Sequence, residues 1–306
     1  MTRALRIAAL FAAYATIGYG GDLAVDLVAQ SVGAARPATE TEAPRPRVEA
    51  RDIVVEVRPA IVSRVQVRHT GTCSYEGRRE LSLPVSDGDR LAVRAGAGAL
   101  HVEGREGLDE VIVVGLLCAS DEAYLDGLAV SAERSSDGRV DVVTHYPTNR
   151  NRSAGRDVAR IDLTVLLPRG MAVGVDDSSG DLTVSGTGNL EIDDSSGSIE
   201  ASDVDGTVRI DDSSGGIDLR DVTGSVEIAD GSGGLELQDI GGSVRLRDGS
   251  GGIEVVRVEG DLVVEADGSG GIEARDVGGD FIVRRDGSGG IRYSGVAGRI
   301  DVPRRR

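Results

Sequence analysis

The chain has 306 residues and a formal net charge of -17 at pH 7, with no tryptophan and only 3% aromatic residues. Because nucleic acids and anionic membrane surfaces repel a strongly negative protein, this charge argues against both as partners. The length allows two domains.

The chain begins with a short positive leader at residues 1–6, followed by small and apolar residues at 7–18. This pattern predicts a secretory signal peptide over residues 1–34, since the apolar run is too short for a membrane span. An amphipathic terminal helix of a cytoplasmic protein is the alternative. Residues 35–47, rich in Pro, Thr and Glu, are predicted to form a flexible linker. We therefore expect an exported protein of the periplasm or cell surface.

Residues 48–170 are predicted to form an irregular, β-rich N-terminal region. Short apolar alternations at 91–93 and 100–102 flank small residues and resemble a worn copy of the repeat that follows. We expect this region to form degenerate first coils or an abutting β layer that caps one end of the repeat, because a bare end would expose strand edges.

The two cysteines, Cys73 and Cys118, both lie in this region. In an exported protein they are expected to form one disulfide. Closing a loop of roughly 45 residues would stabilise the fold by about 3 to 4 kcal/mol. Two free buried cysteines are the alternative. The three histidines stand at no metal-ligand spacing.

Residues 171–303 repeat one pattern seven times: a turn such as Asp-Asp-Ser-Ser-Gly or Asp-Gly-Ser-Gly-Gly, then two apolar alternations separated by a glycine. By subtraction of their residue numbers, successive turn aspartates lie 17 to 19 positions apart. They are Asp177, Asp194, Asp212, Asp230, Asp248, Asp267 and Asp286.

A fixed period with alternation of this kind predicts an all-β fold, a single-chain β-solenoid similar to a β-helix. Each coil would hold about 18 residues in two short strands and bury its apolar face only by stacking on its neighbours. Like residues would stand in columns about 4.8 Å apart. The longer later coils require a β-bulge, for which Ala266 and Arg285 are the expected extra residues. Residues 304–306 are an arginine tail.

The turn aspartates admit two interpretations. In the first, each carboxylate braces its own turn by accepting backbone N–H groups of the Ser-Gly segment. In the second, successive carboxylates share divalent cations, with calcium as the candidate ion. The seven aspartates are then the candidate metal ligands.

A second acidic column falls between the two apolar residues of each first strand. It consists of Glu200, Asp218, Glu236, Glu254 and Glu273. A solvated face that promotes solubility is one explanation. A face that binds a basic partner or divalent cations is the other, and it makes these residues the candidate partner-binding site.

Enzyme chemistry finds little support in this pattern. No histidine lies in the repeat region, and a carboxylate pair that recurs in every coil indicates a scaffold rather than a tuned acid and base. We expect no catalytic residues and no cofactor other than calcium.

The segments Ser-Gly-Ser-Ile-Glu-Ala (196–201), Ser-Gly-Gly-Ile-Asp-Leu (214–219) and Ser-Gly-Gly-Ile-Glu-Val (250–255) resemble the repeats of the bacterial putative adhesin family. The resemblance implies an envelope protein built of β-strand repeats, and it assigns no biochemical activity.

We therefore expect a noncatalytic, exported protein that binds or supports an unknown envelope or surface partner through an acidic solenoid face. Three alternatives stay open: a calcium-stabilised surface adhesin, a carbohydrate-active β-helix enzyme, and an envelope-stress accessory protein.

Overall fold

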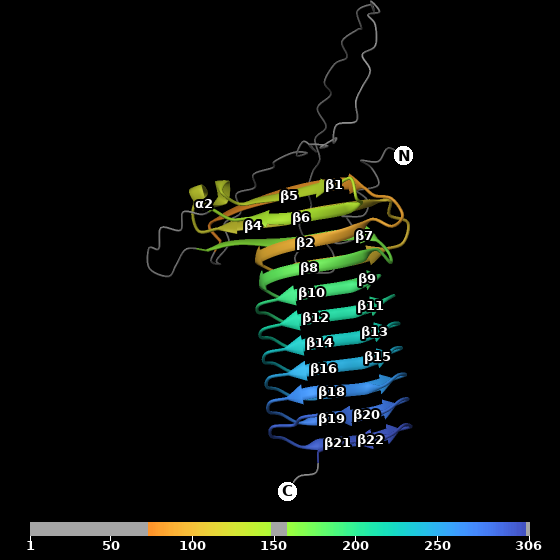
Figure 1. Cartoon of the computed structure of the whole chain (residues 1–306). Helices are drawn as coiled ribbons and strands as arrows, with labels where there is room; N and C mark the ends of the chain where they lie inside the picture. The colour runs from red at the N-terminus through yellow and green to blue at the C-terminus, as the bar shows by residue number, and fades with distance from the viewer. Residues whose placement is uncertain (1–72, 148–157, 304–306) are drawn as a thin grey trace, which may run out of the picture. The chain divides into compact units, whose positions relative to one another are not determined.

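The structure is a computed structural model that describes residues 73–147 and 158–303, in which nearly all regular secondary structure is β-strand (Figure 1). All described residues belong to one compact unit, Arg51–Arg306. The predicted signal peptide, linker and arginine tail lie outside the described residues and stay predictions. Within the described ranges, no helix has the length and hydropathy needed to cross a membrane.

The repeat region forms a β-solenoid, as predicted, in which every coil contributes one strand to each of two parallel sheets. In the first sheet the coil strands are β9 (Leu182–Thr187), β11 (Ile199–Val204), β13 (Ile217–Val222), β15 (Leu235–Ile240), β17 (Ile253–Val258), β19 (Ile272–Val277) and β21 (Ile291–Val296). In the second sheet they are β8 (Ala172–Ser179), β10 (Leu190–Asp194), β12 (Val208–Asp212), β14 (Val226–Asp230), β16 (Val244–Asp248), β18 (Leu262–Asp267), β20 (Phe281–Val283) and β22 (Ile300–Asp301).

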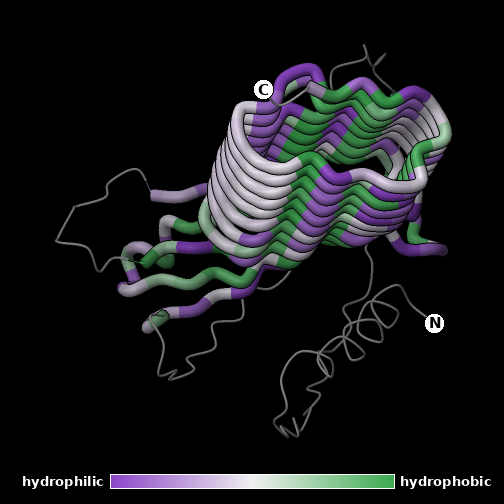
Figure 2. Tube along the Cα trace, turned by 90° about the horizontal axis from the view of Figure 1, so that it is seen from below, coloured by the Kyte–Doolittle hydropathy of each residue, from purple (hydrophilic) through white to green (hydrophobic). Residues whose placement is uncertain are grey.

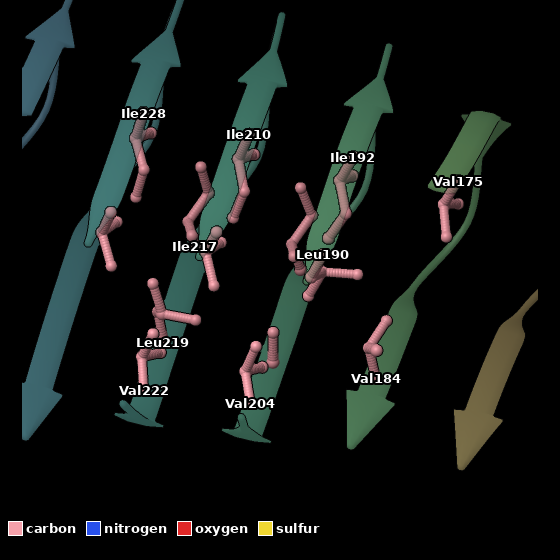
Figure 3. Packing of buried hydrophobic residues seen from close by; sticks show 14 of the residues in the cluster. Val175, Val184, Leu190, Ile192, Val204, Ile210, Ile217, Leu219, Val222 and Ile228 are labelled. Carbon is pink, nitrogen blue, oxygen red and sulfur yellow. The ribbon is translucent and has the colours of Figure 1, made fainter. Parts of the chain in front are cut away.

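The core lies between the two sheets, because alternate residues of each strand point inward. Ile217 and Leu219 of β13 are 1% and 0% exposed, and Val222 closes the same coil at its corner. Figure 3 shows Val222 next to its counterpart Val204 in the neighbouring coil, and Ile210 between its counterparts Ile192 and Ile228. Equivalent residues pair directly from coil to coil, so bands of one hydropathy run along the stack in Figure 2.

One bulge accommodates the extra residue of the later coils. Leu246 pairs with Val264 and Arg247 with Ala266, which leaves Glu265 unpaired in the ladder. The bulge was predicted at Ala266, one residue too late. The Glu265 carboxylate bonds to Arg245 of the coil before and to Arg284 of the coil after, so this ion-paired position takes up the extra residue. In the next coil Val264 pairs with Val283 and Asp267 pairs with Asp286, so the two coils have the same number of residues between these positions. Arg285, the other predicted extra residue, therefore corresponds to Ala266 and adds no residue relative to the coil before it.

The N-terminal region continues both sheets and ends them in antiparallel strands. Its elements are β1 (Tyr75–Pro84), β2 (Arg90–Ala97), β3 (Leu100–Arg105), β4 (Glu110–Ala119), α2 (Glu122–Asp126), β5 (Ala129–Arg134), β6 (Arg139–His145) and β7 (Ala159–Pro168). Strands β2 and β3 form a coil that pairs in parallel with β8 and β9. Beyond that coil, the first sheet continues with β4, which is antiparallel to β7, and ends with β1, which is antiparallel to β4. In the second sheet, β5 is the end strand and is antiparallel to β6.

The predicted disulfide is confirmed. Cys73 is bonded to Cys118, with their Cα atoms 5.4 Å apart, and no free cysteine remains in the chain. Because Cys118 lies in β4 and Cys73 just precedes β1, the bond ties together the two outermost strands of the first sheet.

Candidate functional site

The repeated aspartates form a continuous column inside the solenoid rather than at its surface. We call Asp177, Asp194, Asp212, Asp230, Asp248 and Asp267 the interior aspartate column. Each pairs in register with the next along the second sheet, and each is between 1% and 6% exposed. Asp286 extends the column at its C-terminal end, where it is only partly buried.

Strand alternation explains why these side chains point inward. Leu190 and Ile192 of β10 face the core, and Asp194 is the next residue in the same alternation. The aspartate that precedes it, Asp193, is exposed. The same pair of an exposed and a buried aspartate recurs at Asp211 and Asp212.

One carboxylate oxygen of most column members is bonded to its own turn. The backbone N–H of Ser196 donates to Oδ1 of Asp194 at 3.2 Å, and that of Ser250 donates to Oδ1 of Asp248 at 3.0 Å. Asp212 and Asp230 accept in the same way from the serine two residues later. The turn-brace interpretation is therefore confirmed for one oxygen of each of these carboxylates.

The other oxygen is buried without a partner. Oδ2 of Asp177, Asp194, Asp212, Asp230 and Asp248 has no hydrogen bond, and neither oxygen of Asp267 has one. A buried polar atom without a partner costs about 1 to 3 kcal/mol, and more when it is charged. Turn bracing accounts for only half of each carboxyl group.

Burial raises the pKa of every member of the column. Desolvation, reinforced by the negative charge of Asp194, raises the pKa of Asp177 to about 6. Desolvation likewise raises the pKa of Asp212 and of Asp248 to about 6, with further contributions from the aspartates of the adjacent coils. Two charged carboxylates about 4.8 Å apart would repel by about 3.5 kcal/mol at an effective dielectric of 20.

The arrangement is a straight line of carboxyl groups rather than a cage. Calcium takes six to eight oxygen ligands. Within the described residues, no group of three or more His, Cys, Asp or Glu side chains is placed to hold a metal ion. We assign no metal to the column, and the calcium ladder predicted from sequence stays a prediction.

The second acidic column lies on the outside of the first sheet. Glu200, Asp218, Glu236, Glu254 and Glu273 pair in register from β11 to β19 and alternate with buried apolar residues. We call these five residues the outer acidic column. The column ends at Arg292 of β21.

Arginines neutralise part of this outer column. Arg220 is paired with Asp218, and Arg275 bridges Glu254 and Glu273. These arginines stand two residues further along the same strands. Among the described residues, Glu200 and Glu236 have no ion pair and are exposed, so they are the least compensated part of the column.

The sequence did not predict a groove that lies beside the corner residues of four coils, Val222, Ile240, Val258 and Val277. It has a volume of about 870 Å³ and is lined by Asp203, Asp221, Asp239 and Asp276, with Arg257 among them. All five adopt positive φ angles, between 55° and 59°. Aspartate tolerates this left-handed conformation better than most residues, so a recurring Asp just before a corner Val was the available signal. Arg257 is bonded to Asp239, which lowers the pKa of Asp239 to about 2.

The described residues include one close Ser–His pair outside the repeat. Ser131 Oγ lies 2.8 Å from His145 Nε2 on the antiparallel strands β5 and β6. His145 is exposed, and neither Ser131 nor His145 lines the aspartate-lined groove. A nucleophile and base need a site that holds substrate beside them, so we assign no catalytic role to this pair.

Comparison with known proteins gives likenesses of fold only. No family model and no curated protein sequence matches the chain. Three solved structures are similar to 74% of the chain: a putative adhesin from Bacteroides fragilis (13% identity, 97% of that chain, TM-score 0.45), a putative cell adhesion protein from Clostridium sporogenes (13%, 98%, 0.26) and a putative lipid binding protein from Parabacteroides distasonis (16%, 97%, 0.40). The first two names are of the kind that the sequence resemblance implied.

Proposed function

We propose that this chain is an exported, noncatalytic envelope protein that binds a basic partner through the outer acidic column. One observation carries the proposal: five acidic side chains stand in register on one sheet face, and Glu200 and Glu236 lack a compensating cation among the described residues. Like charges in a strand ladder destabilise it, so the fold itself gains nothing from this column.

The disulfide supports the exported location. Disulfides persist in oxidising compartments and are rare in the cytosol. The Cys73–Cys118 bond joins the outermost strands of the first sheet, where it would be a structural link in the periplasm or at the cell surface.

The regularity of the coils supports a binding role over catalysis. Active sites on repeat scaffolds interrupt the repeat with loops and with perturbed, convergent polar groups. Here the inward positions of the repeat are apolar or aspartate, apart from Thr187, and the outward positions present rows of exposed side chains.

Capture from envelope extract tests the proposal. The bait is the chain from residue 35 onward, and the first variant is Glu200→Gln/Glu236→Gln/Glu254→Gln. A matched control, Glu191→Gln/Asp193→Asn/Asp211→Asn, removes the same charge from exposed positions of the second sheet. We expect a partner retained by the native bait and the control and lost by the first variant.

If all three baits retain the same proteins, the outer acidic column is not the contact surface. The same conclusion follows if the control variant loses the partner as completely as the first variant, because the net charge of the protein alone would then explain the binding.

A further inference from the structure

The interior aspartate column is buried without a balancing cation. Among the described residues, the other buried polar or charged side chains are Thr187 and Asp89, and Asp89 is already paired with Arg134. Six charged carboxylates in an apolar interior would each carry a desolvation cost and would repel their neighbours.

In the part of the chain that the structure describes, no basic side chain is buried beside the column. The first sheet faces it with the apolar side chains of the core. Its own strands place Asp176, Asp193, Asp211 and Arg247 next to it in sequence, at exposed outward positions. Arg285 is exposed in the same way beside Asp286. From the N-terminal region, the charge of Asp177 acts on Tyr146 and contributes, after desolvation, to a raised pKa of that phenol.

The unpartnered carboxylate oxygens of the column lack a hydrogen-bond donor. An ionised carboxylate can only accept hydrogen bonds, so two stacked carboxylates cannot bond to each other until one is protonated. The carboxyl groups of Asp230 and Asp248 belong to residues that pair in register on β14 and β16, and their interaction contributes to their pKa values in opposite directions.

We propose that the interior aspartate column is a proton-binding ladder, in which carboxyl groups of successive coils share protons, so that acidification locks the coils together. The proposal stands on the register of the column, its burial, its unpartnered oxygens and the lack of a buried cation among the described residues.

The sign of the pH effect follows from linkage. The pKa values of Asp177, Asp212 and Asp248 rise from 3.8 to about 6 on folding. The folded state therefore binds more protons than the unfolded state between about pH 4 and pH 6. The stabilisation is complete below about pH 4 and is lost as the pH rises through 6. The depressed pKa values of Asp137 and Asp239, both about 2, act only at lower pH.

Calorimetric melting of the full chain between pH 4.5 and pH 7.5 tests the proposal. We expect the melting temperature of the native protein to rise by at least about 5 °C on acidification across this range. In Asp194→Asn/Asp212→Asn the amide keeps the turn-bracing oxygen and has its own donors, so this variant is expected to melt higher at pH 7.5 and to show a smaller rise in melting temperature on acidification than the native protein.

The control Asp193→Asn/Asp211→Asn removes the same charge one residue earlier, where the side chains are exposed. It is expected to keep the pH dependence of the native protein. Equal pH profiles for the native protein and both variants would overturn the proposal, as would a melting temperature that falls on acidification.

Two further measurements distinguish protons from metal ions in the column and report on the native carboxyl groups directly. Calcium and chelator are added in separate melts at pH 7.5, and a rise with calcium that vanishes in Asp194→Asn/Asp212→Asn would show that metal, not protons, occupies the column. If that variant does not fold, carbon NMR of the native aspartate carboxyl groups decides. Carboxyl groups that titrate near pH 6 support the ladder, and ionisation of all of them by pH 5 contradicts it.

Discussion

Each coil turns at a glycine whose position is limited by the carbonyl group of the coil before it. Gly251 has a φ of 147°, and a Cβ atom placed on it would lie 1.5 Å from the carbonyl oxygen of Gly233. The next residue, Gly252, would present its Cβ to open space, with nothing within 4 Å. The two adjacent glycines therefore differ sharply in the space available for a larger side chain.

Gly251→Ala is expected to destabilise the solenoid by at least about 2 kcal/mol, because the methyl group must separate two stacked coils or strain the backbone. Gly252→Ala in the same turn is the control and is expected to change stability by less than about 1 kcal/mol. Urea unfolding monitored by circular dichroism measures both. Equal loss in the two variants would contradict the stacked turn geometry.

The sequence predicted only part of the environment of Asp194. Asp194 follows Leu190 and Ile192 at the same two-residue spacing, so strand alternation already placed it inside. It was interpreted as a turn residue because aspartate is common in turns and rare in cores. Its hydrogen bond to the turn and its buried second oxygen are both real, and only the packed structure shows the two together.

At the scale of the elements, the N-terminal strands close one end of the solenoid. Strands β1 and β4 pair along ten residues each, and the disulfide joins them at one end. Antiparallel pairs of this length carry their own hydrogen bonds, whereas each solenoid strand depends on the coils above and below it.

Cys73→Ala/Cys118→Ala is expected to lower the stability of this end by about 3 kcal/mol, because the 45-residue separation is no longer cross-linked in the unfolded state. The effect should be local, since coils contact only their neighbours. Hydrogen exchange followed by mass spectrometry is expected to show faster exchange in β1 and β4 and unchanged exchange in β15 and β17. Equal acceleration throughout would mean that the whole chain unfolds as one unit.

The repeated elements could be predicted from sequence, but the order of strands at the N-terminal end could not. Period and alternation define the coils from β8 onward, because each pairs with the next copy along the chain. Strand β3 instead pairs with β7 and β9, across an insertion that contains β4, α2, β5 and β6. Such long-range pairings depend on packing between segments that share no repeat.

At the scale of the molecule, stacking converts a short repeat into two acidic columns with opposite environments. The interior aspartate column is buried and is suited to hold protons, while the outer acidic column is open to solvent and to a partner. The coils of the repeat bury their apolar residues between the two sheets. The outward side chains are therefore what distinguishes the outer face of one sheet from that of the other.

Site-specific photo-crosslinking in cells that produce the protein tests the central claim most directly, because it asks which sheet face meets a partner. The cross-linking residue is placed at Val256, an outward position of β17 beside the outer acidic column, or at Ala229, an outward position of β14 in the second sheet. Both positions are uncharged and half-buried. The account predicts a discrete protein adduct from Val256 that disappears in Glu200→Gln/Glu236→Gln/Glu254→Gln, and none from Ala229. An adduct from Ala229 alone, or no adduct from Val256, would contradict it.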